Sequence, residues 1–223
     1  MPKETFFGID KEKQNRIIQA AIKVFSSHNY NDSSINEVIK LAKIPRGSFY
    51  QYFEDKRDLY LYIAQKIMQN FRDDFFKELD EQNGDIFATV KIVFPKQIHE
   101  VLGGEYSNFY YYLLQASFMK DFRQKEVKSK DNSKHGWNVK QDFDVIYKMI
   151  DKEKLKVKSR SDFDMFIRIL ITPFIIVITD TFLQMKHESD IPKIDIEEKK
   201  QEYLHKLEFI EYGFSKGYVT TNS

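Results

Sequence analysis

The sequence has no cysteine and little glycine or proline, with 8 Gly and 5 Pro among 223 residues. The absence of cysteine excludes a disulfide framework, thiol catalysis and zinc sites with cysteine ligands. Few Gly and Pro residues mean few interruptions of regular structure, which favours a mostly helical chain. We therefore expect an all-α fold, and 20 Phe with 13 Tyr supply large side chains for a sizeable core.

Charge of one sign is lacking as well, because 35 Lys and Arg stand against 34 Asp and Glu. The balance alone therefore indicates no polyanionic partner. The longest uncharged apolar run, residues 169–179, is too short for a bilayer, which takes ~20 residues. The first residues also lack the apolar core of a signal peptide. We expect a cytoplasmic protein with no membrane partner.

Groups for catalysis and metal binding are equally scarce. No pair among the five histidines has metal-ligand spacing, and the sequence shows no nucleophile motif or phosphate-cradling glycine loop. Glu202 and His205 form half of a di-iron carboxylate pattern, but a second Glu-x-x-His is missing, which favours a solvated helix face. We expect no catalytic residue, no metal and no cofactor.

The most informative stretch runs from residue 34 to residue 59. Ser34 and Glu37, placed just before apolar residues, form a capping box and start a helix. Pro45 holds the residue before it in an extended conformation and fits the first turn of a second helix. Asp55 then caps a longer helix. Two short helices joined by a tight turn are typical of a helix-turn-helix, whose second helix enters the DNA major groove.

The second short helix, residues 46–53, has two unlike faces. Phe49 and Phe53 lie four residues apart and are expected to pack against the preceding helices. At about 100° per residue, the other face carries Gly47, Ser48, Tyr50 and Gln51, with Arg46 at its N-terminal edge. Because it holds no acid and no aliphatic side chain, this face suits base edges and phosphates better than a protein core.

With these residues the segment resembles the DNA-binding region of the TetR/AcrR family of bacterial transcriptional regulators. The residues that match the family pattern in order and spacing are Ser34, Ile35, Val38, Ile44, Gly47, Phe49, Tyr50, Tyr52, Phe53, Asp55, Lys56 and Leu59. Three positions depart from it. Asn29 replaces a usual glycine, Lys43 a common turn glycine, and Pro45 a common serine. Asn tolerates the left-handed conformation that glycine provides.

The resemblance implies roles for single residues. The residues it places at base edges or the nearby backbone are Arg46, Ser48, Tyr50 and Gln51, with Gly47 allowing close approach. The residues it places at phosphates are Ser34, Tyr52 and Lys56. It also implies that residues 1–55 form a helix-turn-helix DNA-binding domain and that residues 56–223 form a helical ligand-binding and dimerisation domain.

Hydrophobic periodicity predicts about nine helices in all. Those outside the central motif are expected at residues 10–28, 56–82, 85–102, 106–122, 138–152, 161–187 and 195–218. Pro95 and Pro173 are expected to kink their helices. Leu155 and Val157 alternate with lysines, which is a weak strand signal. The resemblance implies that residues 161–187 and 195–218 of two subunits pair into a four-helix bundle, giving a homodimer on a palindromic operator.

Aromatic side chains gather in the predicted C-terminal domain. Those that would line a pocket for an apolar or amphipathic effector are Phe87, Phe94, Phe109, Tyr112, Phe118 and Phe174. The alternative is that each is an ordinary core residue. Three consecutive tyrosines, 110–112, cannot all face one core, however, so at least one hydroxyl reaches solvent, a partner or a pocket.

Three functions therefore compete. The first is a ligand-responsive transcriptional regulator, a repressor in its commoner form. The second is a helical-bundle enzyme that uses the aromatic cavity, with Glu202 and His205 at a metal. The third is a helical adaptor that uses the N-terminal face for protein contacts. The face at residues 46–51 separates them, because an adaptor would place apolar residues there.

Overall fold

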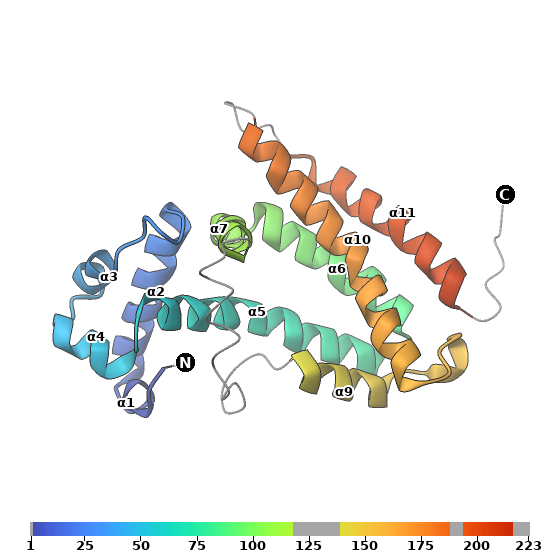
Figure 1. Ribbon diagram of the computed structural model, residues 1–223, viewed down its shortest axis with the longest axis horizontal. Helices are drawn as coiled ribbons and strands as arrows, with labels where there is room; N and C mark the ends of the chain where they lie inside the picture. Colours follow the sequence, from blue (N-terminus) through green and yellow to red (C-terminus); the bar gives the residue numbers. More distant parts are fainter. Residues whose placement is uncertain (1, 118–138, 188–193, 216–223) are drawn as a thin grey trace. The chain divides into compact units, whose positions relative to one another are not determined.

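The computed structural model describes residues 2–117, 139–187 and 194–215, and regular structure in those ranges is helical apart from one isolated bridge (Figure 1). The α-helices are α1 Glu4–Phe7, α2 Lys11–Ser27, α3 Ile35–Ala42, α4 Arg46–Tyr52, α5 Lys56–Glu81, α6 Ile86–Gly103, α7 Ser107–Ser117, α9 Val139–Met149, α10 Arg160–His187 and α11 Ile196–Phe214. A 3-10 helix, η1, spans Lys152–Lys154. The predicted all-α fold class is confirmed.

The described residues divide into two compact units. The first unit holds residues 2–70 and 105–117, which include α1 to α4, the beginning of α5, and α7. The second unit holds residues 71–104, 139–187 and 194–215, which include the end of α5, α6 and α9 to α11. Because α5 contributes to both units, the boundary expected at residue 56 remains a prediction.

Caps define the helices of the first unit. Asp10 accepts a hydrogen bond from the N–H of Lys13 and starts α2, and Asp55 accepts one from Asp58 and starts α5, both at 2.8 Å. Ser34 caps α3 as predicted, but its hydroxyl accepts from the N–H of Asn36 at 3.2 Å rather than from Glu37. The expected capping box is therefore a simpler Ser cap.

The turn before α4 shows why Lys43 is unusual. Lys43 follows α3 with φ 52° and ψ 49°, in the left-handed region where a glycine is favoured. Asn29, by contrast, is not among the described residues with positive φ. Its side-chain oxygen instead accepts from the N–H of Asn31 at 3.0 Å and of Asp32 at 3.1 Å. Asn29 thus replaces glycine through an Asx turn rather than through the left-handed conformation that its sequence suggested.

The core of the first unit is largely aromatic. Phe25 lies edge-on to Tyr60, and Tyr60 also packs against Phe109 of α7, with ring centroids 4.8 and 5.2 Å apart. Phe6 of α1 is 0% exposed and packs against Phe53 with ring centroids 4.9 Å apart. Helix α1 was not predicted, because four residues are too few to show a helical period.

The core of the second unit lies where α6 packs against α10 and α11. Phe94 stacks on Phe174 at 5.0 Å and on Phe71 at 5.6 Å, and it meets Tyr203 edge-on. The buried hydroxyl of Tyr203 donates to the carbonyl of Val90 at 3.1 Å. Helices α6 and α10 both run on through their prolines.

A tight turn connects α5 to α6. Gly84 has φ +78°, and a Cβ there would lie 2.3 Å from the carbonyl oxygen of Met149. The carbonyl of Gly84 also accepts from the N–H of Asp151 at 2.9 Å. Further along, the weak strand signal proves to be a single bridge between Leu155 and Ser215. These backbone contacts tie the ends of the second unit's helices together.

Within the described residues, one helix is long and apolar enough to cross a membrane, namely residues 160–185 of α10. A core helix of a soluble protein passes the same test, and 44% of the apolar window is buried. The sequence predicted a helix at residues 161–187, but the uncharged run within it was too short for a bilayer because two charges, Arg168 and Asp180, bound that run.

Candidate nucleic-acid interface

Helix α4 has the two faces that its sequence predicted. Phe49 and Phe53 are both 0% exposed and pack into the first unit's core. Tyr50 is 42% exposed, and the remaining outward residues are Arg46, Gly47 and Gln51, exposed, and Ser48, half-buried. Six of the eight predicted DNA-contacting residues therefore lie on α4, and five of these lie on its outward side.

Gly47 has no structural reason to be glycine. A Cβ built on it would meet nothing within 4 Å, so the fold leaves room for a side chain. Glycine inside a helix costs about 1 kcal/mol relative to alanine. An outside partner that approaches the backbone closely would account for this residue, which is the role that the resemblance gave it.

Arg46 is held across the turn between α3 and α4. Its Nη1 donates to the side-chain oxygen of Asn36 at 3.0 Å. The guanidinium has five donors in a fixed fork, so this single bond leaves others for a phosphate or a base. Asn36 was not among the predicted site residues, although its exposed place in the first turn of α3 was the available signal.

Tyr52 and Lys56 lie apart from this face. Tyr52 is 5% exposed, and its ring packs edge-on against Phe6 at 6.1 Å. The Nζ of Lys56 donates to the carbonyls of Tyr30 and Ser33 at 2.6 and 3.0 Å. Their phosphate contacts remain predictions, and in this structure both residues act within the protein.

The ammonium of Lys56 organises the loop before α3. Besides those two bonds it donates to the carbonyl of Asn31 at 3.3 Å, which uses all three of its N–H donors. It also lies 4.5 Å from the centre of the Tyr30 ring. Burial lowers the pKa of Lys56 while Asp32 opposes this, and burial raises the pKa of Tyr30 to about 12. Lys56 is therefore a local tie between α5 and the loop at residues 30–33.

The predicted effector residues belong to both units. Phe87, Phe94 and Phe174 belong to the second unit, where Phe94 and Phe174 stack. Phe109 lies in the core of the first unit, and Tyr112 belongs to that unit too. Phe118 lies outside the described residues. The stack also contains Phe71 and Tyr203, which were not among the predicted effector residues.

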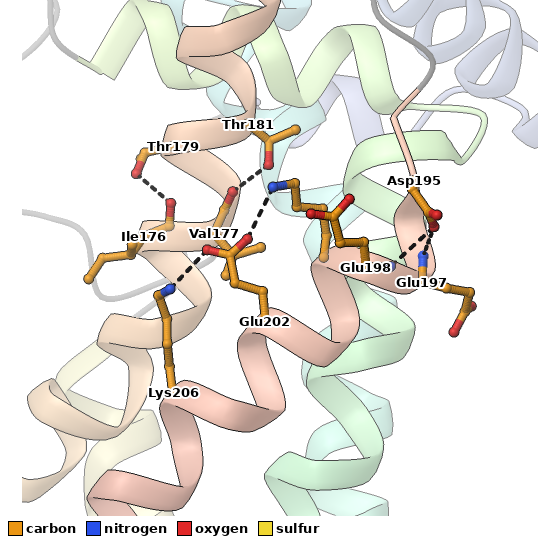
Figure 2. A network of polar contacts seen from close by, with 10 residues as sticks. Ile176, Val177, Thr179, Thr181, Asp195, Glu197, Glu198, Glu202 and Lys206 are labelled. Atoms are coloured by element: carbon orange, nitrogen blue, oxygen red, sulfur yellow. Dashed lines mark hydrogen bonds and ion pairs between the residues drawn. The ribbon is translucent and has the colours of Figure 1, made fainter.

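Helices α10 and α11 expose large apolar side chains. The most exposed are Phe209 at 70%, Tyr212 at 60%, Leu183 at 54%, Met165 at 52%, Ile175 at 47% and Ile176 at 38%. The threonines of α10 add little polarity, because Thr172, Thr179 and Thr181 donate back to carbonyls of their own helix. Figure 2 shows the hydroxyls of Thr179 and Thr181 bonded to the carbonyls of Ile176 and Val177 in the same helix.

Glu202 sits in a salt-bridge cluster on α11. It accepts from Lys206 at 2.9 Å and from Lys199 at 3.1 Å, and the pair with Lys206 is visible in Figure 2. The bond from Lys206, more than that from Lys199, lowers the pKa of this carboxyl group. His205 beside it is exposed, and among the described residues no group of three metal-ligating side chains occurs. In this structure Glu202 is thus engaged by two lysines of its own helix.

Family models match both parts of the chain. A model described as bacterial regulatory proteins, tetR family, matches residues 17–63. A second, described as the tetracyclin repressor-like C-terminal domain, matches residues 85–214. The first begins within α2 and ends within α5, and the second covers α6 to α11.

Similar proteins in curated collections match over a short stretch. The uncharacterised HTH-type regulator YuxN of Bacillus subtilis is 45% identical over 51 residues, which are 23% of this chain and 18% of that protein. YvdT of the same organism is 36% identical over 73 residues, 33% of this chain and 35% of that protein. The matches thus span well under half of either relative.

Solved structures match over nearly the whole chain. A TetR-family regulator of Mesorhizobium loti has a TM-score of 0.63 at 13% identity, covering 92% of this chain and 98% of that one. FadR of Bacillus subtilis, in complex with stearoyl-CoA, has a TM-score of 0.58 at 19% identity, covering 89% and 98%. At such identities the likeness shows the fold alone. The family models decide the assignment, and the chain belongs to the TetR family of bacterial transcriptional regulators.

Proposed function

We propose that this regulator is a ligand-responsive repressor that binds a palindromic DNA operator as a homodimer. A small molecule bound within residues 56–223 releases it from the operator. The observation that carries the proposal is the outer face of α4, where polar side chains surround a glycine that the fold does not require. Such a face fits the major groove, where amides and guanidinium groups recognise base edges.

The dimer is supported by α10 and α11. Their exposed apolar side chains, with Phe209 at 70%, form a surface that water solvates poorly and a second copy would cover. A two-fold dimer presents two α4 helices, and paired half-sites then lie about one helical turn apart or a multiple of it. The predicted pairing region extends to residue 218, and its last residues, 216–218, lie outside the described residues.

The effector is supported by the aromatic stack of the second unit. Phe71 and Phe174 stack on the buried Phe94, and their half-buried rings supply apolar surface for an apolar or amphipathic molecule. Two structures with the same fold were solved with ligands of this kind, the SmeT–triclosan complex and FadR with stearoyl-CoA. A tenfold loss of DNA affinity needs a difference of only ~1.4 kcal/mol in ligand affinity between the two states.

The rest of the proposal follows from the role. DNA is the partner, so the protein acts in the cytoplasm, and α10 is a core and dimer helix rather than a membrane span. The enzyme hypothesis has no support in the salt-bridged Glu202, and the adaptor hypothesis has none in the polar face of α4.

The test selects DNA from a random duplex library with the purified chain and then measures affinity for the enriched duplex. We expect a palindrome bound by two subunits. Gln51→Ala should reduce discrimination at one base pair by about 1–3 kcal/mol, because it removes a side chain that reads base edges. A chain that is monomeric at micromolar concentration and enriches no sequence would refute the proposal.

The regulatory half needs its own measurement. Apolar and amphipathic compounds are screened for a rise in thermal stability, and each hit is titrated into the complex with the enriched duplex. We expect at least one hit to lower DNA affinity by about tenfold, since a ligand shifts the equilibrium only through its differential affinity. If every stabilising compound leaves DNA affinity unchanged, the regulatory role is wrong even where DNA binding stands.

A further inference from the structure

The C-terminal end of α4 has backbone carbonyls that need hydrogen-bond donors from outside the helix. The last four carbonyls of any α-helix lack partners within that helix. In α4 these belong to residues 49–52, and only the first of them is satisfied locally, by the N–H of Phe53 at 2.8 Å. The carbonyls of Tyr50, Gln51 and Tyr52 need donors from elsewhere.

All three donors come from one N-terminal segment that precedes the helix-turn-helix. The Nζ of Lys3 donates to the carbonyl of Tyr50 at 2.8 Å, and the backbone N–H of Lys3 donates to that of Tyr52 at 2.8 Å. The hydroxyl of Thr5 donates to the carbonyl of Gln51. The ammonium of Lys3 also lies where positive charge favours a helix dipole.

This segment is fixed by its own core residue. Phe6 is 0% exposed and packs against Phe53 and Tyr62, with ring centroids 4.9 and 5.5 Å away. The side chain of Gln14 donates to the carbonyl of Phe7, at the other end of the segment, at 3.4 Å and to that of Ile9 just beyond it at 2.9 Å. Lys3 and Thr5 are themselves exposed, so they add little apolar burial.

We propose that residues 3–7, which we name the N-terminal clamp, position α4 for sequence reading, with Lys3 and Thr5 as positioning residues. The inference rests on the proposed DNA binding. The carbonyls held by the clamp belong to Tyr50 and Gln51, whose side chains are the predicted base readers. Binding constellations work only when held within about 0.5 Å of their productive geometry, and a seven-residue helix cannot hold its last turn alone.

The sharpest variant is Thr5→Val, which removes one hydroxyl at nearly constant volume and changes no charge. We expect affinity for the duplex enriched by the wild-type chain to fall about fivefold, since one hydrogen bond contributes about that factor. Affinity for a scrambled duplex should stay within twofold, and Thr5→Ser should restore the wild-type ratio. A residue that merely supports folding would change both affinities together.

Two further measurements separate positioning from other roles. Hydrogen exchange of the peptide covering residues 46–53 should quicken in Thr5→Val without DNA present. Ser27→Ala is the matched control, because Ser27 also donates from an exposed hydroxyl to a carbonyl, that of Lys23 at 2.8 Å, but within α2. It should leave both the exchange of that peptide and the affinity ratio unchanged.

Lys3→Met tests the charged member of the clamp. Positioning predicts a loss confined to the enriched duplex, with the salt dependence of binding unchanged. A role in phosphate binding predicts an equal loss on every duplex and a salt slope lower by about one, which would overturn the assignment of Lys3.

The outcomes also separate this inference from the proposed function. If the wild-type chain enriches a duplex and Thr5→Val keeps the wild-type affinity ratio and exchange, the clamp is overturned while DNA binding stands. If the wild-type chain enriches no duplex, the proposed function fails and the clamp's role in reading fails with it.

Discussion

The first unit turns an amide, a hydroxyl and a guanidinium outward on α4, whereas the second unit turns Phe209, Leu183 and Met165 outward on α10 and α11. Both surfaces belong to helices whose opposite sides are buried in the core. They therefore differ in the side chains that remain exposed after the protein has folded. An exposed polar face is soluble by itself and suits a charged, hydrated partner, while an exposed apolar face is stabilised only when another protein covers it.

The two units also use glycine in opposite ways. Gly47 in the first unit has open space around it, whereas Gly84 in the second has φ +78° and backbone atoms within 3 Å of a built Cβ. One glycine is dispensable for the fold and the other is required by it. The comparison indicates that Gly47 lowers the stability of its helix and leaves the backbone accessible, whereas Gly84 is needed for the turn itself.

Breaking the apolar surface should have the largest effect. We expect the double variant Ile176→Asp and Phe209→Asp to be monomeric by light scattering, because each copy buries two charges at the interface. Operator affinity should fall by about a hundredfold or more, since the two half-sites no longer act together. Leu41→Asp, which changes an exposed side chain of the first unit, should leave the dimer intact. A dimeric double variant would place the interface elsewhere.

Adding a side chain at Gly84 of the second unit should have the second-largest effect. Gly84→Ala forces a Cβ against the carbonyl of Met149 and an unfavourable φ on a non-glycine residue. We expect the free energy of unfolding to fall by about 2–3 kcal/mol, measured by denaturant titration. A loss below about 0.5 kcal/mol would mean that the turn at Asn83 relaxes without cost.

The tie made by Lys56 should have a smaller effect. Lys56→Met removes an ammonium that donates to three carbonyls, and we expect the free energy of unfolding to fall by about 1 kcal/mol after solvent screening. Because no donor is left for a phosphate, the salt slope of DNA binding should fall by less than one. A full unit of slope without any loss of stability would support the phosphate contact that the resemblance implied.

The smallest change in stability should be a gain. Gly47→Ala should raise the free energy of unfolding by about 0.5–1 kcal/mol, because alanine favours the helix and its Cβ meets nothing within 4 Å. DNA affinity should fall in the same variant, since the methyl group obstructs close approach. Denaturant titration and DNA titration on one sample measure both. A stabilised variant with unchanged affinity would remove Gly47 from the interface.

Local sequence patterns determined much of the first unit. The aromatic spacing of Phe49 and Phe53 gave the buried side of α4, and with it the exposed side, because the helical period fixes both at once. Caps at Ser34 and Asp55 gave two of the helix starts, since these side chains bond to N–H groups two or three residues away. Such features depend only on neighbours in the chain.

Only the tertiary structure decided which distant residues meet. In it the three N–H donors of Lys56 bond to carbonyls of the protein, and Tyr52 is buried. The predicted aromatic residues belong to two different units. The tertiary structure also brought Lys3 and Thr5 to the end of α4, 47 and 46 residues away in sequence. No local period records such pairs, because their donors and carbonyls are brought together by packing of the core rather than by spacing along a helix.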